Sequence, residues 1–210
     1  MNGADALDRL AEALAAAPGV RVGIAESEDE REAIHRLRQR QVAAWTGSTR
    51  PDGTERDEHD AFALQIGGWA DGELVGAMRV VLPAPGRRLP VEQDFDVDIE
   101  PSGQVAEAGR LVIAPEHRGD PAHTAWGALF GCAWLSLRAH GFQVLGGAAS
   151  PRMVSRLRGL GLPFEVLGPE REHWGRRRVP VRLDPAGGDP RWYVPAAPPD
   201  PVAGEPGDQL

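Results

Sequence analysis

The segment at residues 105–120, VAEAGRLVIAPEHRGD, places two charges inside what is otherwise an apolar strand. Glu107 and Arg110 are three residues apart, so regular alternation would point their side chains to opposite faces of a sheet. Burying either charge without a partner is costly. Gly109 lies between them, and a glycine within a strand often marks a bulge. The segment therefore predicts a bulged strand that turns both charged groups toward one cleft.

Composition excludes several functions. The chain of 210 residues is long enough for one ordinary domain, and its formal net charge of -8 argues against a nucleic acid or an anionic membrane as the main partner. All of its cations are arginines, which excludes a Schiff-base lysine and a phosphate-loop lysine. Cys132 is a lone cysteine, so it is interpreted as a small core residue. No apolar run approaches the ~20 residues of a membrane span, and we expect a cytoplasmic protein.

Hydrophobic periodicity and turn signals predict alternating helices and strands. Helices are predicted over 4–17, from the capping-box pair Ser27 and Glu30 to near Trp45, over 120–141 and over 150–160. Strands are predicted over 20–25, 61–69, 73–82, from 105, and over 142–148, 163–167 and 178–183, with long loops at 46–59 and 83–103. Ala70-Asp71-Gly72 carries a hairpin signal. This order indicates an α+β fold with a mixed α/β sheet.

The ends of the chain differ from its middle in composition. Residues 1–19 are expected to form a helical extension, residues 20–184 a single domain, and residues 185–210 a flexible tail rich in proline and glycine. Trp192 and Tyr193 are the tail residues that we expect to dock back onto the domain.

Further charged residues lie at positions with two interpretations. ERDEHD at 55–60 is either a solvated charge run or part of a site. Arg79 in GAMRVV is an edge residue, a side chain whose apolar stem is buried while its charge reaches water, or a buried cation that needs carboxylates such as Glu107, Asp57 and Asp60. The PEHRGD turn at 115–120 precedes a long helix, so it is a weak signal for phosphate binding through His117 and Arg118. Asp120 is better explained there as a helix cap.

The order of these motifs resembles a known family. LRQRQV is followed by Trp45, E-x-D-x-x-D at 55–60, GAMRVVLP, LPVEQDF and E-x-x-R-L at 107–111. This series resembles the acyl-homoserine-lactone synthases and the long-chain N-acyl amino acid synthases, both within the GNAT acyltransferase superfamily. VIAPEHRG is similar to the acyl-carrier-binding turn of that superfamily.

The resemblance implies a GNAT-like fold, namely a twisted mixed sheet with a bulged central strand flanked by helices, and an acyl transfer reaction. The charged set that would line the acceptor cleft is Arg38, Asp57, Asp60, Arg79, Glu107 and Arg110. The residues that would bind the acyl donor are Leu111, Val112, Ile113, His117, Arg118 and Gly119. The donor would be an acyl-carrier-protein or coenzyme A thioester, with no metal and no permanently bound cofactor. The acceptor would be a small amine such as an amino acid or S-adenosylmethionine, giving a signal or a secondary metabolite.

The implied chemistry is attack of an amine on an acyl thioester. Glu107 is the candidate general base, because an ammonium must lose a proton before it attacks. Arg110 and Arg79 are expected to hold that carboxylate ionised and to bind an acceptor carboxylate, while Asp57 and Asp60 hold the acceptor ammonium or orient the arginines. The apolar helix at 126–137 either floors an acyl pocket or is a plain core helix.

Two alternatives stay open from the sequence. One is a coenzyme-A-dependent acetyltransferase that acts on a small molecule or peptide. The other is a GNAT-like binding module without turnover.

Overall fold

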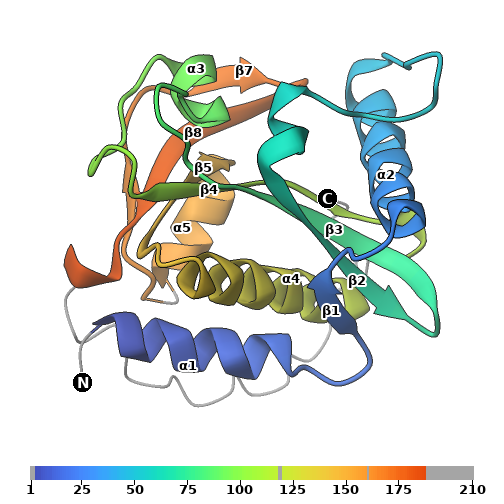
Figure 1. Ribbon diagram of the computed structural model, residues 1–210, viewed down its shortest axis with the longest axis horizontal. Helices are drawn as coiled ribbons and strands as arrows, with labels where there is room; N and C mark the ends of the chain where they lie inside the picture. Colours follow the sequence, from blue (N-terminus) through green and yellow to red (C-terminus); the bar gives the residue numbers. More distant parts are fainter. Residues whose placement is uncertain (1–2, 118–119, 160, 188–210) are drawn as a thin grey trace.

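A computed structural model describes residues 3–117, 120–159 and 161–187 (Figure 1). The helices are α1 (Gly3–Ala15), α2 (Glu28–Thr46), α3 (Pro90–Phe95), α4 (Asp120–Ala139) and α5 (Pro151–Gly159), with short 3-10 helices at Glu58–Phe62, Pro115–His117 and Pro185–Gly187. The strands are β1 (Arg21–Ile24), β2 (Ala63–Ala70), β3 (Glu73–Val81), β4 (Val105–Ile113), β5 (Val144–Ala149), β6 (Phe164–Val166), β7 (Arg171–His173) and β8 (Arg176–Leu183). The mixture confirms the predicted α+β class.

The strands form one mixed sheet in the order β1-β2-β3-β4-β5-β8-β6, and β7 pairs with β8. Every pair is antiparallel except β4 with β5, which is parallel. The β4–β5 pairing covers only three positions, from Val105 opposite Val144 to Glu107 opposite Gly146, although both strands continue beyond it. The centre of the sheet therefore opens where β4 passes Glu107.

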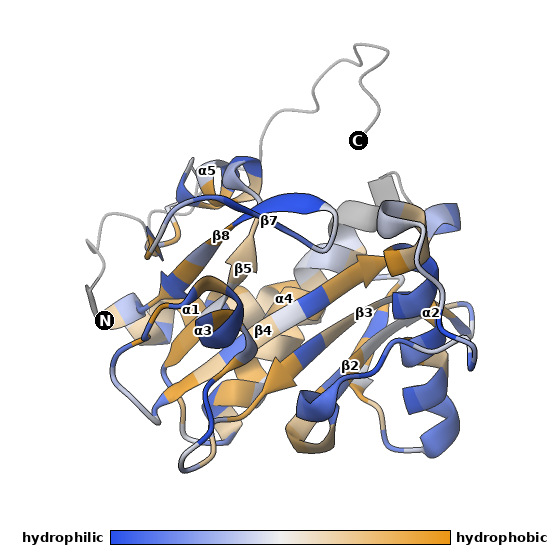
Figure 2. Cartoon of the chain, turned by 90° about the horizontal axis from the view of Figure 1, so that it is seen from above, coloured by the Kyte–Doolittle hydropathy of each residue, from blue (hydrophilic) through white to orange (hydrophobic). Residues whose placement is uncertain are grey.

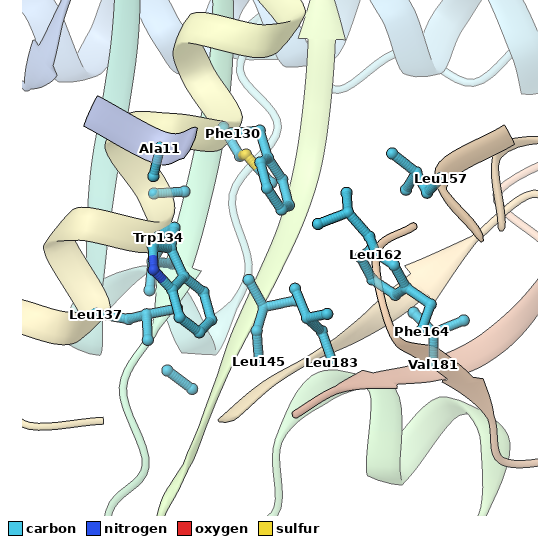
Figure 3. Close-up of a cluster of buried hydrophobic side chains, with 14 of the residues drawn as sticks. Ala11, Phe130, Trp134, Leu137, Leu145, Leu157, Leu162, Phe164, Val181 and Leu183 are labelled. Atoms are coloured by element: carbon cyan, nitrogen blue, oxygen red, sulfur yellow. The ribbon is translucent and has the colours of Figure 1, made fainter. Parts of the chain in front are cut away.

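Helices cover both faces of this sheet. Figure 1 shows α1 and α4 together on one face, with α2 and α3 on the other. Figure 2 shows the contrast in hydropathy between the hydrophobic α4 and the hydrophilic α2. The main core lies on the α4 side, where side chains of α1, α4 and α5 pack on the sheet (Figure 3). The α2 face carries smaller clusters and leaves room for charged side chains between them.

Local signals explain where several elements begin and turn. The Ser27 hydroxyl accepts from the Glu30 backbone N–H at 3.1 Å and the Glu30 carboxylate accepts in return, so the predicted capping box is present. The β2–β3 hairpin turns at Asp71 and Gly72, which both have positive φ angles (51° and 84°). This is the Asp-Gly signal for a two-residue turn, and its prediction is confirmed.

The structure corrects two parts of the predicted secondary structure. The segment 83–103 was expected to be a loop, but it contains α3, which begins with Pro90 and is capped by the Glu92 carboxylate accepting from the Leu89 N–H at 2.8 Å. Strand β7 was also missed. Six helical residues and a three-residue strand are both too short to show a hydrophobic period, which is the physical reason for these errors.

The N-terminal helix packs into the main core. Leu7 and Ala11 are fully buried against α4, and the Asp8 carboxylate accepts from the Trp134 indole N–H at 2.7 Å. A Cβ added at Gly131 would lie 2.4 Å from the Ala11 carbonyl oxygen, so this glycine allows the two helices to approach closely. Trp192 and Tyr193, which were expected to dock, lie outside the described residues. Within the described part of the chain, no helix combines the length and apolar character of a bilayer span.

Candidate active site

A bulge in β4 brings the two charged residues of the opening segment to one face of the sheet. Glu107 pairs with Val81 and Gly109 with Arg79, but the next register position joins Val112 to Ala77, so β4 has one extra residue there. Arg110 takes up this residue with a φ of 52°. Without the bulge, Arg110 would point toward α4. The predicted bulge is confirmed, and its left-handed residue is Arg110 itself.

Three arginines and three carboxylates form one buried network between α2, the 55–60 segment and the sheet. Arg110 contacts Glu55 at 3.3 Å and Asp57 at 2.8 Å. Arg79 contacts Asp57 at 2.6 Å and Asp60 at 3.1 Å. Arg38 contacts Asp60 at 2.7 Å and also pairs with Glu55. The number of cations equals the number of carboxylates, so no charge in the network lacks a partner.

These contacts decide the protonation of the network. Burial alone would raise the pKa of Asp57, but the Arg79 and Arg110 guanidiniums outweigh it and lower that pKa. Burial likewise opposes ionisation of Asp60, and Arg38 with Arg79 holds its pKa far below the usual range. The 55–60 segment thus contributes three carboxylates to a largely buried charged network, and its interpretation as a solvated run is wrong: Glu55 is 1% exposed.

Two members of the network were missed as site residues. Glu55 was quoted within the E-x-D-x-x-D motif but received no role, and it joins Arg38 to Arg110. The Gln65 amide donates to Asp60 at 2.8 Å. A signal for Gln65 was present in the sequence, because it is a polar residue on an apolar strand directly opposite Arg79.

Glu107 lies beside this network without joining it. Its side chain is buried, with the residue 5% exposed, and its Oε2 accepts from the Val91 backbone N–H at 2.7 Å. Burial raises the pKa of Glu107 to about 7, against the opposing effects of the Val91 N–H, Arg79 and Arg110. The expectation that the two arginines hold Glu107 ionised is therefore corrected. Their direct partners are the other carboxylates, which leaves Glu107 as a group that titrates near neutral pH.

A cavity of about 180 Å³ opens where β4 and β5 separate. Its lining includes Glu107, residues 108–111 and residues 147–150. Its apolar end is lined by Trp126, Phe130, Met153, Leu157 and Phe164. Trp126 and Phe130 stack with ring centroids 5.6 Å apart and an interplanar angle of 5°. Helix α4 therefore contributes both to the core and to a pocket, the two roles left open by its sequence.

The β7–β8 hairpin supplies cavity residues that the sequence did not indicate. Its two-residue turn is Trp174-Gly175, with φ angles of 55° and 67°. Trp174 lies over Arg110, with the guanidinium carbon 4.2 Å from the ring centroid. A positive φ at a bulky residue is unusual and marks a constrained position. The Trp-Gly pair between two short charged segments is the signal that could have indicated this turn.

The predicted donor-binding residues are dispersed. Leu111 lines the cavity, whereas Val112 is buried toward α2 and Ile113 packs against the main core. His117 is half-buried near Glu73, at 3.9 Å. Arg118 and Gly119 lie outside the described residues. Among the described residues, no group of three or more His, Cys, Asp or Glu side chains could hold a metal ion.

Comparisons with known proteins show which proteins the chain is similar to. Residues 35–126, from α2 through β4 into α4, match the family model described as "Acetyltransferase (GNAT) domain". A search of the curated proteins finds no match. The domain match and the architecture together support an acyltransferase with the GNAT fold, as the motifs predicted.

Several solved structures share the fold of the chain at low sequence identity. The AHL synthase LasI is 20% identical with a TM-score of 0.64, over 79% of this chain and 89% of that chain. FeeM, an N-acyl amino acid synthase from uncultured soil microbes, is 19% identical with a TM-score of 0.60, over 82% and 92%. The CoA-dependent acyl-homoserine lactone synthase BjaI, solved with SAM and isopentyl-CoA, is 18% identical with a TM-score of 0.60, over 79% of each chain. The suspected resemblance to these synthases is confirmed at the level of the fold.

Proposed function

We propose that the protein transfers an acyl group from a thioester to the amine of a small acceptor, giving an amide. The observation that carries this proposal is Glu107, a buried carboxyl with a pKa of about 7 on the wall of an apolar cavity. A general base works best when its pKa is close to the working pH. Glu107 takes a proton from the acceptor ammonium, and the free amine attacks the thioester carbonyl.

The bulge supplies the second element of the mechanism. The β4–β5 pairing ends at Glu107, and Gly109 and Arg110 line the cavity beyond that point. Backbone N–H groups in this position stabilise the oxyanion that forms on the thioester carbonyl. The thiolate then leaves on its phosphopantetheine arm.

The acceptor binds at the outer part of the charged network. Asp57 and Arg110 have side chains that are 22% and 15% exposed, whereas Arg38 and Arg79 are each 1% exposed. Asp57 and Arg110 therefore meet the ammonium and carboxylate of an amino-acid-like acceptor. Arg38, Arg79 and Asp60 lie beneath them and fix their positions.

The acyl tail occupies the apolar end of the cavity. An apolar protein cavity of about 150 Å³ accommodates a benzene ring, so about 180 Å³ has room for a chain of about six carbons. Longer fatty chains require the lining side chains to move. Acyl carrier protein and coenzyme A present the same phosphopantetheine arm, so both are candidate donors, and the product would be a signal or a secondary metabolite.

The test is direct synthesis with the purified full chain. The protein is incubated with acyl-coenzyme A and acyl-carrier-protein thioesters of two to twelve carbons, together with the twenty amino acids or S-adenosylmethionine, and amides are identified by mass spectrometry. We expect amides of medium chains and no product from Glu107→Gln. Equal use of acetyl-coenzyme A would favour a coenzyme-A-dependent acetyltransferase. Absence of any amide would overturn the proposal.

A further inference from the structure

The proposed reaction moves more protons than Glu107 can carry. An ammonium acceptor becomes an amide N–H, so its nitrogen loses two protons in all, while the departing thiolate gains one. Glu107 accepts the first proton, and because it is only 5% exposed, it holds that proton until the acylation is complete and then loses it to solvent. A second group at the cavity must therefore handle the proton that leaves the nitrogen after attack.

His173 lines the same cavity as Glu107 and can carry this proton. Among the described residues lining the cavity, it is the one side chain besides Glu107 that exchanges protons near neutral pH. Arg110 and Arg178 also line the cavity, but a guanidinium stays protonated.

Residues of helix α3 contact both Glu107 and His173. Its Val91 N–H donates to Glu107, and at its other end Asp94 lies 3.1 Å from Nε2 of His173. The Phe95 ring packs edge-on against the imidazole, with centroids 5.3 Å apart. The Asp94 contact is within ion-pair distance but lacks hydrogen-bond angles, so Nε2 is a buried ring nitrogen without a hydrogen bond. A buried polar atom left in this state calls for a functional explanation.

We infer that His173 is the second proton carrier of this site, taking a proton from the tetrahedral adduct and delivering it to the departing sulfur. This inference rests on the proposed function. In the first step Glu107 removes one ammonium proton, and the amine electron pair forms the C–N bond. In the second step neutral His173 removes the other proton, the C–S bond breaks, and the sulfur receives that proton from the imidazolium. Glu107 then releases its proton to solvent.

The charges around His173 suit this role. Burial lowers its pKa, and Arg110 on β4 and Arg178 on β8 lower it further, while Asp94 on α3 raises it. The ring is therefore neutral at pH 7 and ready to accept a proton. Asp94 stabilises the imidazolium that exists between the two transfers.

The leaving group provides the sharpest test. An aryl thiolate departs readily without a proton, whereas an alkyl thiolate, which is more basic, departs readily only when it receives one. Hexanoyl-coenzyme A and S-phenyl hexanethioate are compared, with a mixture of the twenty amino acids as acceptor and uncatalysed rates subtracted. For His173→Gln we expect kcat to fall on the order of 10²-fold with hexanoyl-coenzyme A, with little change in KM. With the phenyl thioester the loss should be clearly smaller, because the sulfur then leaves without a proton and only the nitrogen proton still needs an acceptor. His140→Gln is the control, since His140 is an exposed histidine at the end of α4.

The outcomes separate this inference from the proposed function. Equal slowing of His173→Gln with both thioesters, or no slowing with either, overturns the role of His173 while leaving acyl transfer in place. Absence of any amide from the wild type overturns the proposed function. If His173→Gln unfolds, Asp94→Asn keeps the imidazole and should give a smaller loss, which is again larger with hexanoyl-coenzyme A than with the phenyl thioester.

Discussion

Glu107 should make stability and activity respond to pH in opposite directions. Its pKa is about 7 in the folded protein against a reference of 4.5. The folded state therefore holds the proton more tightly than the unfolded state, so the carboxyl contributes stability at low pH that is lost as pH rises from about 4.5 to about 7. A difference of about 2.5 pKa units corresponds to about 3 kcal/mol. Activity, in contrast, should rise through pH 7 because the base must be ionised.

The assay compares urea unfolding of the wild type and Glu107→Gln from pH 4.5 to 8.5. Glutamine cannot ionise, so the variant should gain about 3 kcal/mol relative to the wild type between the two ends of this range, with little further change above pH 7.5. Glu165→Gln, at a largely exposed glutamate, controls for removal of a surface carboxylate. A wild-type-minus-variant difference that does not change with pH would refute the buried, near-neutral carboxyl and with it the argument for a general base.

Three further perturbations test the network and the cavity. Arg79→Met removes one partner each from Asp57 and Asp60, so it should lower the free energy of unfolding in urea by about 3–5 kcal/mol. Arg36→Met breaks an exposed ion pair and should lower that free energy by less than about 1 kcal/mol. Trp174→Gly removes the ring over Arg110 and should raise the acceptor KM more than it lowers kcat in initial-rate assays; an unchanged KM would separate Trp174 from acceptor binding. Trp126→Ala lengthens the apolar end of the cavity, so the preferred acyl chain should become longer in a chain-length series, and an unaltered preference would place the tail elsewhere.

The parts of the fold that local chemistry determines were predictable. The Ser27–Glu30 box, the Asp71-Gly72 turn and the long apolar α4 each follow from interactions within a few residues, and each is present. The bulge was also predictable, because two charges three apart on an apolar strand reach one face only if the alternation breaks.

The elements that the sequence did not predict depend on contacts between segments that are distant along the chain. Helix α3 is too short to show a period, and its contact with the candidate site is the Val91 N–H, which donates to Glu107 sixteen residues later. His173 lies on a three-residue strand and reaches the cavity because the β7–β8 hairpin folds over β4. A Cβ added at Gly175 would lie 2.8 Å from the Trp45 carbonyl oxygen, so the tip of this hairpin packs closely on the end of α2. Nothing local in the sequence specifies that contact.

Arg79 and Arg110 are already paired with other carboxylates, and this explains how Glu107 can have a pKa near 7 on a strand that is close to so much positive charge. Arg79 and Arg110 are close enough to Glu107 to oppose the rise in its pKa, and a direct pair with either would hold it ionised well below neutral pH. Glu55, Asp57 and Asp60 occupy those arginines instead, so Glu107 is left with burial as the dominant influence and one backbone N–H as its hydrogen-bond donor. The carboxylates of the 55–60 segment thus do more than orient the arginines. By neutralising them, they leave Glu107 able to gain and lose a proton at the pH where the reaction must run.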